Sequence, residues 1–228
     1  MENKIHAYPK PAVTVDVVIF TVMEFSLQVL LIQRGEEPFK GAWAVPGGFV
    51  RITESLEEAA ARELEEETGI SQAYLEQLYT YGEPERDPRD RIITVAYFAL
   101  IPADKPYRPE GGTDVQRAAW FAIEEHPHLA FDHAEIVQYA LRRLRYKLEY
   151  SAVGFELLPE EFTLSELQRT YEIILGEELD KRNFRRRILD ANIIEATDSM
   201  RSGEGRPARL YRYQSDAVAE VKARRLFP

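Results

Sequence analysis

The chain has 228 residues, of which 45% are hydrophobic and 30% are charged, enough apolar material for one large or two small globular domains. It contains no cysteine, which excludes disulfide bonds, a thiolate nucleophile and cysteine-based zinc sites. The N-terminal residues lack the apolar core of a signal sequence, and no stretch approaches the roughly 18 continuous apolar residues of a membrane helix. We therefore expect a cytoplasmic protein with no membrane partner.

Charge is distributed unevenly along the chain. The formal net charge is −10, and residues 1–150 contribute −9 of it, whereas residues 151–228 contribute only −1. The overall acidity argues against a nucleic-acid coat spread over the whole surface, but the basic residues of the second part are clustered. A local nucleic-acid site is therefore compatible with the composition.

The first 150 residues alternate between strand and helix patterns. Two segments with helical apolar spacing, residues 56–68 and 133–150, follow or interrupt runs of β-branched and apolar residues. The runs that predict strands are residues 12–22, 27–33, 43–45, 74–81, 91–101 and 118–123. This pattern predicts an α/β domain in which helices cover a mixed sheet.

Clear local signals mark both ends of the helix at residues 56–68. Ser55 with Glu58 forms a capping-box pattern, and Gly69 fits the stop position. Before the helix, Gly47 and Gly48 predict a tight turn whose backbone can come close to a metal ion or a phosphate.

The same helix carries a row of carboxylates. Glu66 and Glu67 follow Glu63 by three and four residues, so all three side chains project from one face, where like charges repel. A solvated acidic face is one interpretation. The other is a hard divalent cation, since Mg²⁺ takes oxygen ligands from a few carboxylates and fills its shell with water and phosphate oxygens.

The spacing around these carboxylates resembles the Nudix box. From Gly48, five residues lead to Glu54, seven more lead to Arg62 and Glu63, and then follow Leu64, Glu66, Glu67, Gly69 and Ile70 at the fixed positions. The resemblance implies a Nudix α/β/α sandwich with a mixed sheet over residues 8–150. It also implies a metal-dependent pyrophosphatase that acts on nucleoside diphosphates linked to another group.

The resemblance assigns roles residue by residue. Mg²⁺ or Mn²⁺ would be held by Glu63, Glu66, Glu67 and the carbonyl of Gly47. The catalytic set would be Glu63, Glu66, Arg62 and Glu54, with Arg62 holding the carboxylates through an ion pair with Glu54. A loop carboxylate is an alternative base to Glu63, and the sequence does not choose among Glu83, Glu85, Glu110 and Asp114.

Further residues are candidates for substrate contact. Arg34, Phe49 and Arg86 could bind nucleotide or phosphate, although such residues more often serve the fold. Arg86 lies in a charged loop, residues 82–90, that could be a solvated connection or could reach the substrate. His133, alone at the start of a helix, is interpreted as a structural hydrogen-bonding residue.

The pattern changes after residue 150. A linker with an apolar anchor leads to a helix at residues 163–174, which begins with a Thr163–Glu166 capping box and ends at Gly176. Asp180 then caps a basic helix at residues 181–191, and residues 193–213 predict two short strands joined by a basic turn. Helix, turn, basic helix and basic hairpin are the layout of a winged helix-turn-helix domain over residues 151–228.

The basic helix is the candidate DNA-binding element. Five of the seven residues from 181 to 187 are Lys or Arg, and the turn between the strands adds Arg206. A helix for protein contacts is the alternative, but arginine and asparagine read base edges well. The candidate DNA-binding residues are Lys181, Arg182, Asn183, Arg185, Arg186 and Arg206.

The whole arrangement resembles the Nudix-related transcriptional regulators, the NrtR-like proteins. That resemblance implies an effector such as ADP-ribose, operator DNA bound as a homodimer, and a link to NAD metabolism. Because the box is intact, we expect a DNA-binding regulator that also hydrolyses ADP-ribose or a related nucleotide sugar to AMP and a sugar phosphate. The alternatives are a plain Nudix pyrophosphatase whose C-terminal module serves dimerisation, and a non-catalytic sensor.

Overall fold

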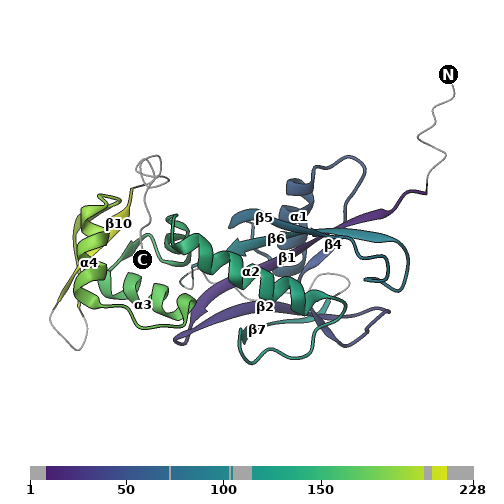
Figure 1. Ribbon diagram of the computed structural model, residues 1–228, viewed down its shortest axis with the longest axis horizontal. Coiled ribbons are helices and arrows are strands. Elements are labelled where there is room, and N and C mark those ends of the chain that lie inside the picture. Colours follow the sequence, from purple (N-terminus) through teal and green to yellow (C-terminus); the bar gives the residue numbers. More distant parts are fainter. Residues whose placement is uncertain (1–8, 72, 103, 105–114, 203–206, 215–228) are drawn as a thin grey trace, which may run out of the picture.

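The chain folds into two parts along one long axis, with the C-terminal helices at one end and a mixed sheet at the other (Figure 1). The computed structural model describes residues 9–71, 73–102, 104, 115–202 and 207–214, without the side chains of residues 67, 68, 115 and 116. Within these ranges, no helix has both the length and the apolar character needed to cross a membrane.

The N-terminal part is built on a seven-stranded mixed sheet. Its main order is β3-β2-β1-β6-β5, with β4 paired to β1 and β7 paired to β2. Among the strand pairs of the described residues in this sheet, only β1–β6 is parallel, with Ala12 opposite Ile92. The strands are β1 (Ala12–Met23), β2 (Ser26–Arg34), β3 (Trp43–Ala44), β4 (Gly47–Phe49), β5 (Tyr74–Tyr81), β6 (Ile92–Leu100) and β7 (Val115–Ala122).

Helices α1 (Leu56–Thr68) and α2 (His133–Leu148) cover opposite faces of this sheet. Alternate residues of β1 separate the two faces: Val17 packs in the core on the α1 side and Val18 in the core on the α2 side. The apolar content of β1 thus reflects burial on both faces. The expected α/β/α sandwich is confirmed.

The local signals for α1 act as predicted. The Ser55 side chain accepts a hydrogen bond from the backbone N–H of Glu58, the Glu58 side chain accepts one from Ser55, and Gly69 ends the helix with φ of 74°. Ala59, Ala60 and Leu64 are buried against the sheet. The other helical face exposes Glu57, Glu58, Glu65 and Glu66, whereas Glu63 is buried.

The predicted Gly47–Gly48 turn is wrong. Both glycines lie in β4, where Gly47 pairs with Asp16 and Gly48 with Val15 of β1. A Cβ at Gly48 would lie 2.3 Å from Glu63 Oε1, and one at Gly47 would lie 2.3 Å from the carbonyl oxygen of Val15. The glycines are needed because strand β4 passes close to the Glu63 carboxylate and to β1.

The C-terminal part has the expected winged-helix layout. Helix α3 begins at the predicted Thr163–Glu166 capping box and ends at Gly176, and α4 begins at Asp180. One strand, β8, was not expected, because it is only two residues long and forms by pairing Phe162 with Tyr211 of β10. The elements are η2 (Val153–Leu157), β8 (Glu161–Phe162), α3 (Leu164–Leu175), α4 (Lys181–Asp190), β9 (Ile194–Arg201) and β10 (Ala208–Tyr213).

One hydrophobic core joins the two parts. It runs from β1 and β2 through α2 to α3 and α4 without a break. At the junction, Gly154 lies against the Tyr171 ring and the Leu148 side chain, and Arg145 Nε of α2 donates a hydrogen bond of 2.7 Å to the carbonyl of Ile174 in α3. Helix α2 is therefore common to both parts.

This packing predicts that Gly154→Ala destabilises the whole chain. The added Cβ would lie 2.7 Å from Tyr171 Cε2 and 2.9 Å from Leu148 Cδ2, both on buried side chains. Overpacking of this kind costs about 1–3 kcal/mol, measurable by chemical denaturation. Gly82→Ala is the matched control, since its Cβ would have no neighbour closer than 3.9 Å. Equal stability of the two variants would contradict the tight junction.

Candidate functional site

A cavity of about 800 Å³ opens beside the carboxylate face of α1. Its walls come from β1, β2, β4, α1, the loop at residues 82–90 and the start of α2. Among the described residues, its lining contains equal numbers of cationic and anionic side chains. They are Arg34, Arg51, Arg62, Arg86 and Arg89, and Asp16, Glu36, Glu63, Glu66 and Asp87.

Arg62 holds the carboxylates of the box together. It binds Glu54 with two hydrogen bonds, Nη2–Oε1 at 2.7 Å and Nε–Oε2 at 2.9 Å, as the sequence predicts. Its Nη1 donates to Glu63 Oε1 at 2.6 Å and to Glu66 Oε2 at 2.9 Å. The Arg62 hydrogen bond lowers the pKa of Glu54 to about 2. One guanidinium thus offsets the repulsion among three carboxylates.

Glu63 is the buried member of this group, with 8% of its surface exposed. Burial raises the pKa of its carboxyl against the opposing effect of Arg62. Its Oε2 accepts no hydrogen bond from the described part of the chain. A carboxylate with one committed oxygen, a second available oxygen and a raised pKa is suited to accept a proton or to bind a cation.

The structure describes three of the four predicted metal ligands, Glu63, Glu66 and Gly47. The Glu66 side chain is 50% exposed and bonds to Arg62 and, at 3.2 Å, to Arg51. The Glu67 side chain lies outside the described residues, and Gly47 lines the cavity from β4. Among the side chains that are described, no three acidic or imidazole groups gather into a metal cluster. The oxygen donors of Glu63 and Glu66 nevertheless fit a hard divalent cation.

A second arginine, Arg86, also lines the cavity. Its side chain is 4% exposed and binds Asp132 with two hydrogen bonds, at 2.8 Å and 2.6 Å, and its Nη2 lies 3.6 Å from Asp16 Oδ2. Arg86 was predicted to contact substrate. It does line the cavity, but its guanidinium is already committed to tying the loop at residues 82–90 to the start of α2.

His133 completes this buried group. Its Nδ1 accepts a hydrogen bond of 3.1 Å from the backbone N–H of Val45, and its Nε2 lies 3.8 Å from Asp16 Oδ1. Burial lowers the pKa of the imidazole despite the neighbouring carboxylates. The geometry agrees with the structural role expected from sequence, because a neutral ring accepts the Val45 bond.

The other predicted substrate residues lie at an aromatic side of the cavity. The guanidinium of Arg34 lies 4.9 Å from the centre of the Phe131 ring, and its Nε donates a hydrogen bond of 2.9 Å to the carbonyl of Pro38. Arg89 lies 5.4 Å from the Phe49 ring. The candidate loop bases Glu83 and Glu85 are exposed and do not belong to the lining, and Glu110 and Asp114 lie outside the described residues.

Asp16, Asp87 and Phe131 are among the cavity residues that sequence reasoning missed. Asp16 carried a usable signal, because an acidic side chain within an otherwise apolar strand needs a buried partner. Asp87 is held by Arg89, two residues away. Phe131 gave no signal, since its position depends on the path of the loop before α2.

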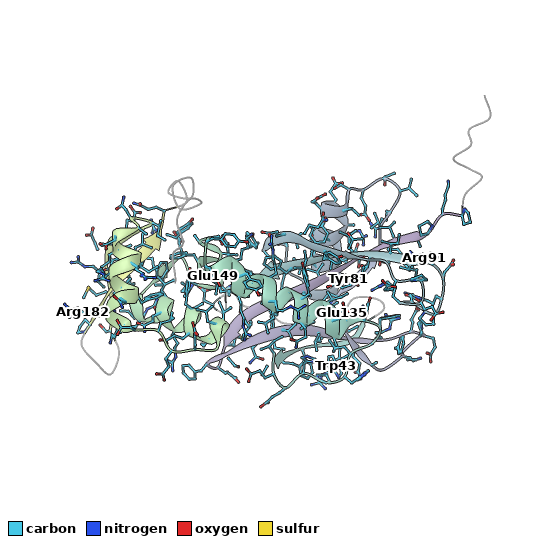
Figure 2. All side chains as sticks on the ribbon, in the orientation of Figure 1. Trp43, Tyr81, Arg91, Glu135, Glu149 and Arg182 are labelled. Atoms are coloured by element: carbon cyan, nitrogen blue, oxygen red, sulfur yellow. The ribbon has the colours of Figure 1, made fainter. Side chains whose placement is uncertain are left out.

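Five of the six predicted DNA-binding residues lie on α4, at the end of the molecule farthest from the seven-stranded sheet, where Figure 2 labels Arg182. Lys181, Arg182 and Asn183 are exposed, while Phe184 of the same helix is buried. Arg186 Nη2 donates a hydrogen bond of 2.7 Å to the side-chain oxygen of Asn183.

Arg185 differs from its neighbours on α4. It is half-buried, and its Nη2 donates a hydrogen bond of 2.9 Å to the Ser165 hydroxyl of α3. Its Nε is buried without a hydrogen bond within the described part of the chain. Arg185 therefore braces α4 on α3. Arg206, which was predicted in the turn between β9 and β10, lies outside the described residues.

The fold and the carboxylate site together define a Nudix domain followed by a winged helix. Residues 10–143 match the family model of the NUDIX domain, and residues 154–213 match that of the NrtR DNA-binding winged helix domain.

Two relatives extend this match. The chain is 45% identical over 210 residues to the ADPR responsive transcriptional repressor NtrR of Acinetobacter baylyi, covering 90% of this chain and 83% of that one. It is 38% identical over 140 residues to the ADP-ribose pyrophosphatase of Methanocaldococcus jannaschii, covering 61% of this chain and 79% of that one.

Two solved structures agree with the fold. Shewanella oneidensis NrtR complexed with a 27mer DNA superposes with a TM-score of 0.79 at 37% identity, covering 91% of this chain and 95% of that one. The NUDIX domain of the same NrtR complexed with ADP ribose superposes with a TM-score of 0.56 at 36% identity, covering 63% of this chain and 94% of that one. The chain therefore belongs to the NrtR-type family of Nudix-related transcriptional regulators.

The buried imidazole predicts a pH dependence of stability. Because folding lowers the pKa of His133, its contribution is fully present above the unfolded-state pKa of about 6.5 and is lost as pH falls toward the folded value. Between pH 7.5 and 5.5, the free energy of unfolding of the parent should fall faster than that of His133→Gln, by up to about 1.4 kcal/mol per pH unit. Exposed His128→Gln is the control and should follow the parent. Parallel profiles for parent and His133→Gln would contradict this account.

Proposed function

We propose that this chain is a DNA-binding transcriptional regulator whose Nudix cavity binds ADP-ribose or a related nucleotide sugar. The observation that carries the proposal is that a cavity lined by arginines and carboxylates and an exposed cationic helix are built on one continuous core. The relatives support it, since one is a repressor responsive to ADPR and one NrtR structure holds DNA. The chain would comprise a Nudix domain at residues 8–150 and a winged helix at residues 151–228.

The cavity suits a nucleotide sugar in size and chemistry. Its volume of about 800 Å³ lies in the usual range of small-molecule sites, about 300–1,000 Å³. Arg51 and Arg89 supply hydrogen-bond donors for phosphate oxygens, and Phe49 and Phe131 supply flat apolar surface. The ADP ribose complex of a related NUDIX domain supports this ligand class.

Hydrolysis to AMP and a sugar phosphate is the second part of the proposal. Because the lining charges balance, a diphosphate would bring uncompensated negative charge, which favours a divalent cation at Glu63, Glu66, Glu67 and the Gly47 carbonyl. A bound Mg²⁺ or Mn²⁺ would offset phosphate charge and make its water more acidic. Arg62 holds the carboxylates in place through Glu54, and Glu63 accepts the proton of the attacking water.

The hydrolytic part predicts that Glu66→Gln releases AMP from ADP-ribose at least about 100-fold more slowly than the parent in Mg²⁺, since losing even an outer-shell partner of a metal site costs about 10- to 100-fold. Glu65→Gln is the matched control, because Glu65 precedes Glu66 on α1 and is exposed away from the cavity lining. The measurement is AMP release followed by chromatography. Equal rates for Glu66→Gln and Glu65→Gln would refute the assignment.

A non-catalytic sensor is the competing function, and one observation favours it. Arg62 Nη1 bridges Glu63 and Glu66, so a cation already lies between two of the predicted metal ligands. If the parent binds ADP-ribose but releases no AMP in Mg²⁺ or Mn²⁺, this sensor replaces the enzyme. A plain pyrophosphatase whose C-terminal module serves dimerisation is the remaining alternative, and it requires that DNA binding be absent.

DNA recognition would follow the winged-helix pattern. Helix α4 would enter the major groove with Lys181, Arg182, Asn183 and Arg186, and the β9–β10 wing with Arg206 would approach the backbone. Arg185 would support DNA binding indirectly, by fixing α4 on α3. We further propose that a homodimer binds a two-fold symmetric operator, because paired half-sites match paired recognition helices.

Arg182→Ala should weaken binding to DNA from upstream of the chain's own operon. Removing one phosphate-facing cation should also reduce the slope of log affinity against log salt by about 1. Arg142→Ala, which removes an exposed arginine from α2 instead of α4, should keep the parental affinity and slope. The measurement is fluorescence anisotropy at several salt concentrations. Parental affinity and slope in Arg182→Ala would remove α4 from the interface.

Helix α2 provides the connection between ligand and DNA. At its start, His133 lines the cavity and the N-cap residue Asp132 binds Arg86 of the cavity lining, and near its end Arg145 and Leu148 contact the winged helix. A ligand shifts DNA binding only by its differential affinity for the two states of the protein. We propose that contacts at the Arg86–Asp132 end of α2 supply this difference.

A further inference from the structure

The turn between β1 and β2 is built from residues that are unfavourable in it. Met23 pairs with Ser26, so the hairpin loop consists of two residues, Glu24 and Phe25, with φ of 50° and 65°. Such loops favour glycine or asparagine, because a residue with a Cβ is disfavoured in the left-handed region. Phe25 is also 71% exposed. An exposed aromatic ring on a disfavoured backbone points to a role other than local folding.

The Phe25 ring contacts the winged helix. The guanidinium of Arg169, an exposed residue of α3, lies 3.9 Å from the centre of the ring. Figure 1 shows the β1–β2 turn beside α3. A guanidinium over an aromatic face makes a cation–π contact, which is favourable even at an exposed site. The tip of the hairpin is therefore joined to α3 in addition to the shared hydrophobic core.

The other end of the same hairpin reaches the cavity. Asp16 of β1 and Arg34 of β2 belong to the cavity lining. From Ile19 and Leu30 to the turn, the two strands are paired residue by residue, and most of their side chains are buried. Close-packed strands of this kind transmit a displacement along their length. The hairpin thus extends from the cavity to α3, as helix α2 does.

Helix α3 is supported at two separate points. Arg145 of α2 donates a hydrogen bond to the carbonyl of Ile174, and the hairpin contacts Arg169, five residues earlier. Five residues correspond to about 7.5 Å along a helix. A single contact would let α3 pivot about it, whereas two separated contacts also restrict its rotation. Because α4 packs on α3 through Arg185, the direction of α4 relative to the sheet depends on both supports.

We propose that Phe25 is a positioning residue that couples the ligand cavity to DNA binding through Arg169. Ligand contacts at the Asp16–Arg34 end of the hairpin displace its tip relative to α3, so that the cation–π contact differs between the two states of the protein. Only such a difference contributes to the response of DNA binding to ligand. This inference rests on the proposed ligand-responsive function and adds a second connection to that of α2.

The test uses Phe25→Gly in the full chain. Glycine removes the ring but suits the left-handed backbone, so the variant should be at least as stable as the parent in chemical denaturation. Phe25→Tyr keeps the aromatic face, and Arg169→Ala removes the contact from the side of α3. Glu24→Gly is the matched control, because Glu24 is exposed and left-handed in the same turn but carries no ring.

The readout is the ratio of the dissociation constants for DNA from upstream of the chain's own operon, with and without saturating ADP-ribose. It is measured by fluorescence anisotropy with chelator present. Phe25→Gly and Arg169→Ala should each bring this ratio about 2- to 5-fold closer to 1, the value of one exposed cation–π contact. The double variant should bring it no closer than either single variant. Phe25→Tyr and Glu24→Gly should keep the parental ratio.

A parental ratio in Phe25→Gly would overturn the inference, as would an equal change of the ratio in Glu24→Gly. Lower stability of Phe25→Gly than of the parent would also contradict it, because the ring would then serve the fold. If ADP-ribose binds the parent but leaves its affinity for DNA unchanged, the proposed ligand-responsive function fails, and this inference fails with it.

Discussion

The rest of the structure depends on the packing of α2 between the mixed sheet and the winged helix. Its buried face contributes to one core that includes Phe20 of β1 at one end and Phe184 of α4 at the other. The Arg145–Ile174 hydrogen bond and the close packing at Gly154 fix the junction. Because packed cores resist continuous deformation, a displacement at the cavity end of α2 would be carried to α3.

Two arginines give the cavity its shape and charge. Arg62 gathers three carboxylates of the box, and Arg86 ties the loop at residues 82–90 to the start of α2. Each arginine is largely buried and bidentate on one carboxylate, the arrangement in which charge-assisted hydrogen bonds are strongest. Of the two arginine clusters, only that of Arg86 reaches the start of α2. In the proposed function the two arginines would therefore have separable roles: Arg62 would serve the phosphate chemistry, and Arg86 would serve the connection to the winged helix.

Local signals allowed most of the fold to be predicted. The capping boxes at Ser55 and Thr163 and the glycines at 69 and 176 act within one helical turn, so the helix ends followed directly from the sequence. Strand β4 could not be found in this way, because its glycines are explained by contacts with β1 and Glu63 that only the folded chain creates.

The candidate site divides in the same manner. The Arg62–Glu54 pair was predictable because both residues belong to one short motif. The Arg86–Asp132 pair joins residues 46 positions apart, and the place of Phe131 in the cavity lining depends on the path of the loop before α2. These features follow from the arrangement of elements around the sheet and leave no periodic trace in the sequence. The Asp within apolar β1 was the one long-range clue that the sequence did offer.

The central claim is that one chain couples a nucleotide-sugar cavity to DNA binding through α2. It is tested most directly by the dissociation constant of the full chain for DNA from upstream of its own operon, measured with and without saturating ADP-ribose. Chelator is included so that the ligand is not hydrolysed during the measurement. The account predicts a shift of about 5- to 150-fold, the usual size of coupling between sites. The same dissociation constant in both conditions, with ADP-ribose shown to be bound, would contradict it.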